Sequence, residues 1–189
     1  MKKKSFVMVL ALVLVFAVAV GGVVAWLTAT TTPVTNTFTV GDINIELDET
    51  TGNSYKVIPG TTIDKNPKVT VKANSEACWL FVKVDKANWN DNLTYTIENK
   101  NGWISYKTVG DITYYYQKVN ATGAEATVIP VLDGNVVNVS GNLAKGEITA
   151  ENQPTLTFTA AAVQQENIGT VEEAFKELPN DFTVATVAP

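Results

Sequence analysis

The stretch "ACWLFVKVD", residues 77–85, is apolar at both alternating positions until Lys83. A strand with one face in water alternates apolar and polar residues, whereas a strand covered on both faces does not. The stretch therefore predicts a central β-strand with other elements packed against both faces. The single cysteine, Cys78, lies in this run, and we expect it to be a buried small side chain rather than a reactive thiol.

Shorter segments with a period of two surround this central strand. Turn-forming residues separate them, as at Pro59-Gly60 and Val109-Gly110-Asp111. Many short strands at this spacing are typical of an antiparallel β-sandwich, and we expect a mainly all-β, jelly-roll-like fold. The predicted strands cover residues 38–48, with a bulge or turn at Gly41-Asp42, and residues 67–73, 93–98, 102–109, 112–119, 127–132, 135–139 and 155–163.

A short helix is expected near the C-terminal end. Thr170 and Glu173 have the spacing of a capping box, and Pro179 follows the last leucine of "TVEEAFKEL". Ala174, Phe175 and Leu178 form its apolar stripe, so we expect the helix to pack on the sandwich. The apolar tail, residues 180–189, is predicted to form a further strand.

The N-terminal end has the pattern of a secretory leader. Lys2–Lys4 precede the apolar run Phe6–Val20, which is followed by Gly21-Gly22 and by "VVA" at positions 23–25. We expect signal peptidase to recognise Val23 and Ala25 and to cut between Ala25 and Trp26. The alternative is an uncleaved anchor, because residues 6–25 are long enough to span a bilayer.

The charge balance and the absent residue types exclude several functions. Of the 14 basic residues three lie in the leader, which leaves 11 against 19 acidic residues, a net charge of −8. The acidic mature chain is a poor candidate for binding nucleic acid. It has no histidine, which excludes Ser-His-Asp and Cys-His nucleophile systems and histidine-based zinc sites. We therefore expect no enzyme activity, no cofactor, no catalytic residues and no metal site.

Other candidate constellations have simpler explanations. The carboxylate clusters Asp48-Glu49, Glu172-Glu173 and Asp85/Asp91 are expected to be solvated surface features. "DKANWNDN", residues 85–92, offers oxygen ligands for calcium but lacks EF-hand spacing. The aromatic residues are expected to pack in the core, and the alternative is a platform that binds carbohydrate; they are Trp79, Trp89, Trp103 and Tyr114–Tyr116. In a strand, Tyr114 and Tyr116 share one face and Tyr115 lies on the other.

Three segments together resemble the bacterial TasA/camelysin family of secreted proteins, which carry a SipW-type signal peptide. They are "GGVVAWLTATTTPVTNTFTVGDINIELDE", "YKVIPGTTIDKNPKVTVKANSEACWLFVKV" and "AAVQQENIGTVEEAFKEL". The resemblance implies a jelly-roll-like sandwich that is cut by a dedicated signal peptidase and displayed at the cell surface or in the extracellular matrix. Relatives assemble into biofilm fibres in which the freed N-terminal segment of one subunit adds a strand to the next. Camelysin is also described as a surface metalloprotease, an activity for which a chain without histidine is poorly suited.

The residues after the predicted cut independently favour strand donation. The segment Trp26–Thr37 is uncharged and rich in threonine, so that pairing with a sheet edge meets no charge repulsion. Pro33 confines the segment to an edge or a bend. We expect it to be unpaired within its own subunit, with the donated strand formed by Trp26, Leu27, Thr28, Thr30, Thr32, Val34 and Thr35.

The sequence thus predicts a leader (residues 1–25), a donor segment (26–37) and a β-sandwich domain (38–189). The expected function is a secreted structural subunit of surface or biofilm-matrix fibres. Its expected partners are further copies of itself in a head-to-tail homopolymer, the signal peptidase and other matrix or surface proteins, with the membrane contacted only through the uncleaved leader. The alternative is a cell-surface module that binds polysaccharide or a host protein.

Overall fold

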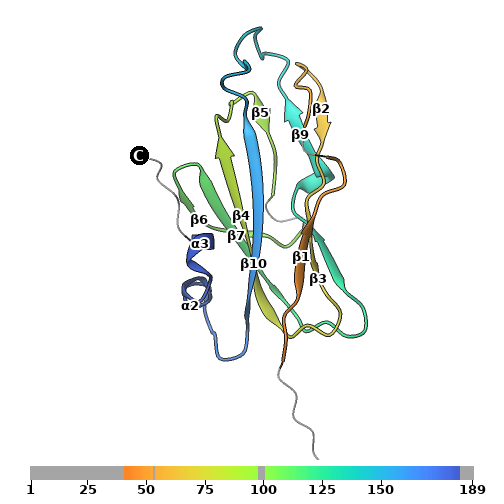
Figure 1. The fold of residues 1–189 in the computed structure, drawn as a ribbon, viewed down its shortest axis with the longest axis vertical. Helices are drawn as coiled ribbons and strands as arrows, with labels where there is room; N and C mark the ends of the chain where they lie inside the picture. Colours follow the sequence, from red (N-terminus) through yellow and green to blue (C-terminus); the bar gives the residue numbers. More distant parts are fainter. Residues whose placement is uncertain (1–40, 53, 98–100, 184–189) are drawn as a thin grey trace, which may run out of the picture. The chain divides into compact units, whose positions relative to one another are not determined.

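The computed structural model describes residues 41–52, 54–97 and 101–183 (Figure 1). Its strands are β1 (Ile45–Asp48), β2 (Thr62–Asp64), β3 (Lys68–Val71), β4 (Cys78–Ala87), β5 (Leu93–Thr94), β6 (Ile104–Val109), β7 (Ile112–Val119), β8 (Thr127–Pro130), β9 (Val136–Val139) and β10 (Thr155–Gln164). A 3₁₀ turn, η1 (Asp133–Asn135), precedes β9, and two short helices, α2 (Val171–Lys176) and α3 (Asn180–Thr183), follow β10.

The strands form three antiparallel sheets. The largest has the order β10-β4-β7-β6, and the two smaller ones have the orders β1-β3-β8 and β2-β9-β5. Buried side chains of β3, β8 and β9 share one core with those of β4, so the small sheets face the large one. The predicted antiparallel β-sandwich with a short C-terminal helix is confirmed.

Strand β4 is the central strand that its sequence predicts. Leu80, Val82 and Val84 point into the core between the sheets. Trp79 and Phe81 point to the opposite face, where they pack against the helices. Both faces of the strand are therefore covered, which explains why its sequence does not alternate.

The helices cover the outer face of the large sheet (Figure 1). The apolar stripe Ala174, Phe175 and Leu178 is buried against this face, together with Phe182 of α3. Thr170 and Glu173 form the expected capping box. Tyr114 and Tyr116 lie on this helix-covered face and Tyr115 on the core face, as the alternation predicts.

Cys78 is buried, as expected, and has no accessible surface. Burial raises the pKa of its thiol to about 11, so the thiol is protonated at neutral pH.

Several expected boundaries were wrong. The tail was expected to be a strand, yet Asn180–Thr183 forms α3, because Phe182 reaches the helix-side cluster. The strand expected at 93–98 pairs only at Leu93–Thr94, and β2 was not anticipated. Asn135 belongs to η1 rather than to the following strand, with a φ of 56° that strand geometry does not allow. Residues 38–40 of the first predicted strand lie outside the described residues, and pairing begins at Ile45.

Candidate functional site

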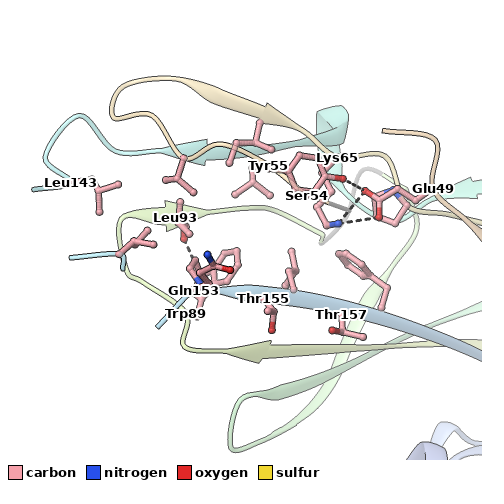
Figure 2. Close-up of a pocket in the computed structure, with 18 of the residues that line it drawn as sticks. Glu49, Ser54, Tyr55, Lys65, Trp89, Leu93, Leu143, Gln153, Thr155 and Thr157 are labelled. Carbon is pink, nitrogen blue, oxygen red and sulfur yellow. Dashed lines mark hydrogen bonds and ion pairs between the residues drawn. The ribbon is translucent and has the colours of Figure 1, made fainter. Parts of the chain in front are cut away.

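A groove of about 1200 Å³ opens between the N-terminal half of β10 and the two small sheets. Figure 2 shows side chains from both walls pointing into it. One wall consists of residues Gln153–Phe158 in and before β10. The opposite wall combines the end of β1, the segment after it, β2 and β9, with Leu47, Tyr55, Val57, Ile63, Lys65 and Val137 among the lining residues.

The two ends of the groove differ in chemistry. Trp89, Leu93 and Leu143 lie at one end, which we call the apolar end, and Glu49 and Lys65 lie at the other, which we call the charged end (Figure 2). A ligand that fills the groove therefore meets hydrocarbon at one end and an ion pair at the other.

The charged end is built around a buried lysine. The side chain of Lys65 is 9% exposed, and its Nζ lies 3.0 Å from both carboxylate oxygens of Glu49, whose side chain is 22% exposed. The rings of Tyr55 and Phe158 lie 5.2 and 5.4 Å from Nζ, within the range of cation–π attraction. A buried cation held in this way is stable only while its carboxylate partner is present.

Tyr55 completes the hydrogen bonding of this ion pair. Its hydroxyl donates to Oε1 of Glu49 over 2.9 Å, and the Thr51 hydroxyl donates to the same oxygen over 3.0 Å. Burial raises the pKa of the Tyr55 phenol, and the charge of Glu49 also raises it, so Tyr55 remains a neutral donor. The charged end is thus a closed network with a fixed geometry.

The apolar end is positioned by hydrogen bonds around Trp89. Its indole N–H donates to the carbonyl of Leu93 over 3.0 Å, and its ring meets the Tyr95 ring edge-on at 5.5 Å. The amide of Asn92 donates to Glu147 over 3.0 Å, which holds the loop carrying Leu143 beside the indole. Burial also raises the pKa of Tyr95, with a smaller effect from Tyr115.

The β10 wall carries unused backbone hydrogen-bonding groups. The amide of Gln165 donates to the carbonyl of Ala77 over 2.8 Å, which places odd-numbered residues of β10 in hydrogen-bonded pairs with β4. The N–H and C=O groups of the even-numbered residues, including Leu156 and Phe158, therefore point away from β4. Among the strands of the described ranges, β4 alone pairs with β10. The groove is bordered by an open sheet edge, which can accept a further strand.

The residues expected to form the cleavage and donor sites are not among the described residues. These are Val23, Ala25, Trp26, Leu27, Thr28, Thr30, Thr32, Val34 and Thr35. The expectation that residues 26–37 are unpaired within their own subunit also stays a prediction.

Most of the candidate aromatic platform is interior. Trp79 is 4% exposed, and Trp103 and Tyr114 have no accessible surface. The indole N–H groups of Trp79 and Trp103 donate to the carbonyls of Ile168 and Pro130. These side chains are core residues, whereas Trp89 lines the groove.

The candidate acidic sites have structural partners. Asp48 pairs at the surface with Lys68 over 3.5 Å, while Glu49, expected to be a solvated surface residue, instead belongs to the half-buried ion pair. Glu173 caps α2. Asp85 lies within β4, and no group of three or more His, Cys, Asp or Glu side chains suited to a metal occurs in the described part of the chain.

No local pattern in the sequence predicts that Lys65 is buried. "TIDKNPK" reads as a polar connection, and nothing in its spacing separates Lys65 from Lys68. Burial of Lys65 results from Tyr55 and Phe158 closing over it from distant parts of the chain.

The helices in the described ranges are all too short and insufficiently apolar to cross a bilayer. No family model, curated protein or solved structure matches this chain.

Proposed function

We propose that this protein is a secreted structural subunit of fibres at the cell surface or in the extracellular matrix, and that the N-terminal segment of one subunit adds a strand to the next. The observation that carries the proposal is the groove beside the unpaired edge of β10. An added strand gains affinity from main-chain hydrogen bonds and specificity from side chains that enter pockets, and this groove offers both.

The chemistry of the segment suits this groove. The side chains of Trp26–Thr37 carry no charge, so they can enter an apolar groove without leaving an ion unpaired. The only charge is the α-ammonium that the cut creates on Trp26, at the tip of the segment. Threonine favours extended backbone, and its methyl group can face the core. The resemblance to TasA/camelysin proteins supports the same function.

A head-to-tail arrangement follows from the two unlike surfaces. Each subunit would present one segment and one groove, and such heterologous contacts form open filaments when the rotation does not close. In this proposal signal peptidase acts first, because its cut between Ala25 and Trp26 frees the segment from the leader.

Deletion of residues 26–37 tests the proposal directly. We expect the mature wild-type chain to form fibres visible by electron microscopy and the deletion variant to remain monomeric by light scattering. The variant should unfold at the same temperature as the wild-type monomer, because the groove and cores lie elsewhere. A synthetic peptide of residues 26–37 should inhibit wild-type assembly, and a scrambled peptide of the same composition should not.

Unchanged fibres from the deletion variant would show that assembly does not use this segment. A wild-type mature chain that stays monomeric across concentration and pH would contradict the structural role itself.

A further inference from the structure

The groove is asymmetric, and this asymmetry selects the direction in which a strand can enter. The apolar end combines the Trp89 ring with Leu93 and Leu143, and the charged end combines Glu49, Lys65 and Tyr55. A strand with two unlike ends therefore has one orientation that matches both.

The donor segment has such unlike ends. It begins with the large apolar side chains of Trp26 and Leu27, with the α-ammonium of the cut chain at its tip, and continues with hydroxyl side chains at Thr28 and 30–32. The Glu147 carboxylate, which accepts a hydrogen bond from Asn92 beside the apolar end, can face that ammonium. A lysine ammonium has three N–H donors, and Glu49 accepts two hydrogen bonds from Lys65. A threonine hydroxyl at this end can accept a hydrogen bond from the third.

We infer that the strand of a second copy enters with Trp26 at the apolar end and with its threonines at the charged end, parallel to β10. This inference rests on the proposed function and specifies its partner surface. The Trp26 indole packs among Trp89, Leu143 and Ile148, and Thr30 lies beside Lys65.

The spacing agrees with this orientation. Thr155, the first residue of β10, and Phe158, whose ring lies 5.4 Å from the Lys65 Nζ, are three residues apart, or roughly 10 Å in a strand, and the apolar end begins just before Thr155 (Figure 2). Trp26 and Thr30 are four residues apart, or roughly 13 Å. The segment thus passes from one end to the other within its first five residues.

Pro33 then falls where strand pairing has to end. Beyond Phe158, β1 lies alongside β10 (Figure 1), and the core-facing side chains of β10 shrink to Ala160 and Ala162. Proline donates no ladder hydrogen bond and bends the chain, so Pro33 directs the segment out of the groove toward its own domain.

The opposite direction mismatches both ends. It would place the Trp26 indole against the Glu49–Lys65 ion pair. It would also place Pro33 nearer the apolar end. There the even-numbered residues of β10 have backbone groups available for pairing, and proline has no N–H to donate to them. Parallel pairing is slightly weaker than antiparallel pairing per residue, but over a contact of about five residues the side-chain match decides the direction.

Paired cysteines in the mature chain test the direction. Leu27 alternates with Trp26, so it lies on the outer face of the sheet, where Thr155 and Thr159 of β10 are exposed. Leu27→Cys with Thr155→Cys brings two thiols together across the subunit contact if Trp26 lies at the apolar end. Leu27→Cys with Thr159→Cys does so only in the opposite direction, because Thr159 follows Phe158 at the charged end. Cys78 is fully buried and leaves the background unchanged.

After mild oxidation of assembled fibres, we expect a ladder of covalent oligomers on a non-reducing denaturing gel from the Leu27/Thr155 pair. The Leu27/Thr159 pair should give at least a tenfold lower cross-linked fraction, and Thr31→Cys with Thr159→Cys should restore the ladder.

Fibres in which the Leu27/Thr159 pair gives the ladder would overturn the direction while leaving strand donation intact. Fibres that cross-link through none of the pairs would also overturn it. Failure of the unmodified mature chain to assemble would instead reject the proposed function.

Discussion

At the scale of single residues, Lys65 distinguishes this domain from an ordinary sandwich. Its ammonium is nearly inaccessible and depends on one carboxylate, whereas Lys68, three residues later, pairs with Asp48 in solvent. A lysine–carboxylate pair thus has two different energetic roles in one short segment, because burial removes the screening that weakens surface ion pairs.

Replacement of Lys65 by methionine should destabilise the domain by about 1–3 kcal/mol, because Glu49 would lose its cationic partner in a half-buried position. The matched replacement Lys68→Met should change stability by less than about 1 kcal/mol, since its partner is exposed. Urea unfolding of both variants, followed by tryptophan fluorescence, measures the difference. Equal effects of the two substitutions would contradict the structural importance of the buried ion pair.

At the scale of elements, α2 is a short helix that depends on its cap and on its packing. The carboxylate of Glu173 accepts hydrogen bonds from the backbone N–H groups of Thr170 and Gly169 over 3.1 and 3.0 Å. These bonds, with the Thr170 side chain contributing less, lower the pKa of Glu173 below its ordinary value. The helix covers Phe81 and Tyr114 of the large sheet, so its cap also influences that face.

The lowered pKa of Glu173 predicts how the stability of the domain changes with pH. A carboxyl group whose pKa is lower in the folded than in the unfolded protein stabilises the folded state when the pH is above the pKa of the unfolded protein. This stabilisation is lost as the pH falls through the pKa of the folded protein. Glu173→Gln should therefore lower the melting temperature near neutral pH, and its difference from wild type should shrink on acidification. Glu172→Gln, without this capping bond, is the control. A difference that does not change with pH would argue against the capping charge.

At the scale of the whole molecule, assembly requires a donor and an acceptor on the same chain. A chain without residues 26–37 retains only the groove, and Leu156→Glu retains only the segment, because it places a charge on the groove wall. We expect neither variant to form fibres alone and their mixture to stop at a dimer, measured by analytical ultracentrifugation. Thr159→Glu, on the opposite face of β10 and outside the groove, should assemble normally.

Fibres from Leu156→Glu alone would show that the groove is not the acceptor. A mixture that grows beyond the dimer would indicate a second contact between subunits.

Local patterns correctly predicted the elements whose residues all lie close together in the sequence. Residues 78–85 have no polar alternation, and β4 is covered on both faces. The capping box at Thr170 is a contact over three residues, and it forms as expected. The failed predictions concern segments whose state depends on distant partners: α3 forms where Phe182 meets the sheet, and β2 exists because Val136–Val139 lies beside it.

The sequence by itself determined the antiparallel β class, the central strand, the capped helix and the burial of Cys78, because alternation, turn residues and caps act over a few neighbouring positions. Only the tertiary structure decided that Lys65 is buried beside Glu49 and that Trp89 lines a groove whereas Trp103 fills the core. The same holds for the edge of β10 that no described strand covers. These features arise where segments from β1 to β10 meet, and the burial of a side chain or the pairing of a strand edge depends on which distant segment lies beside it.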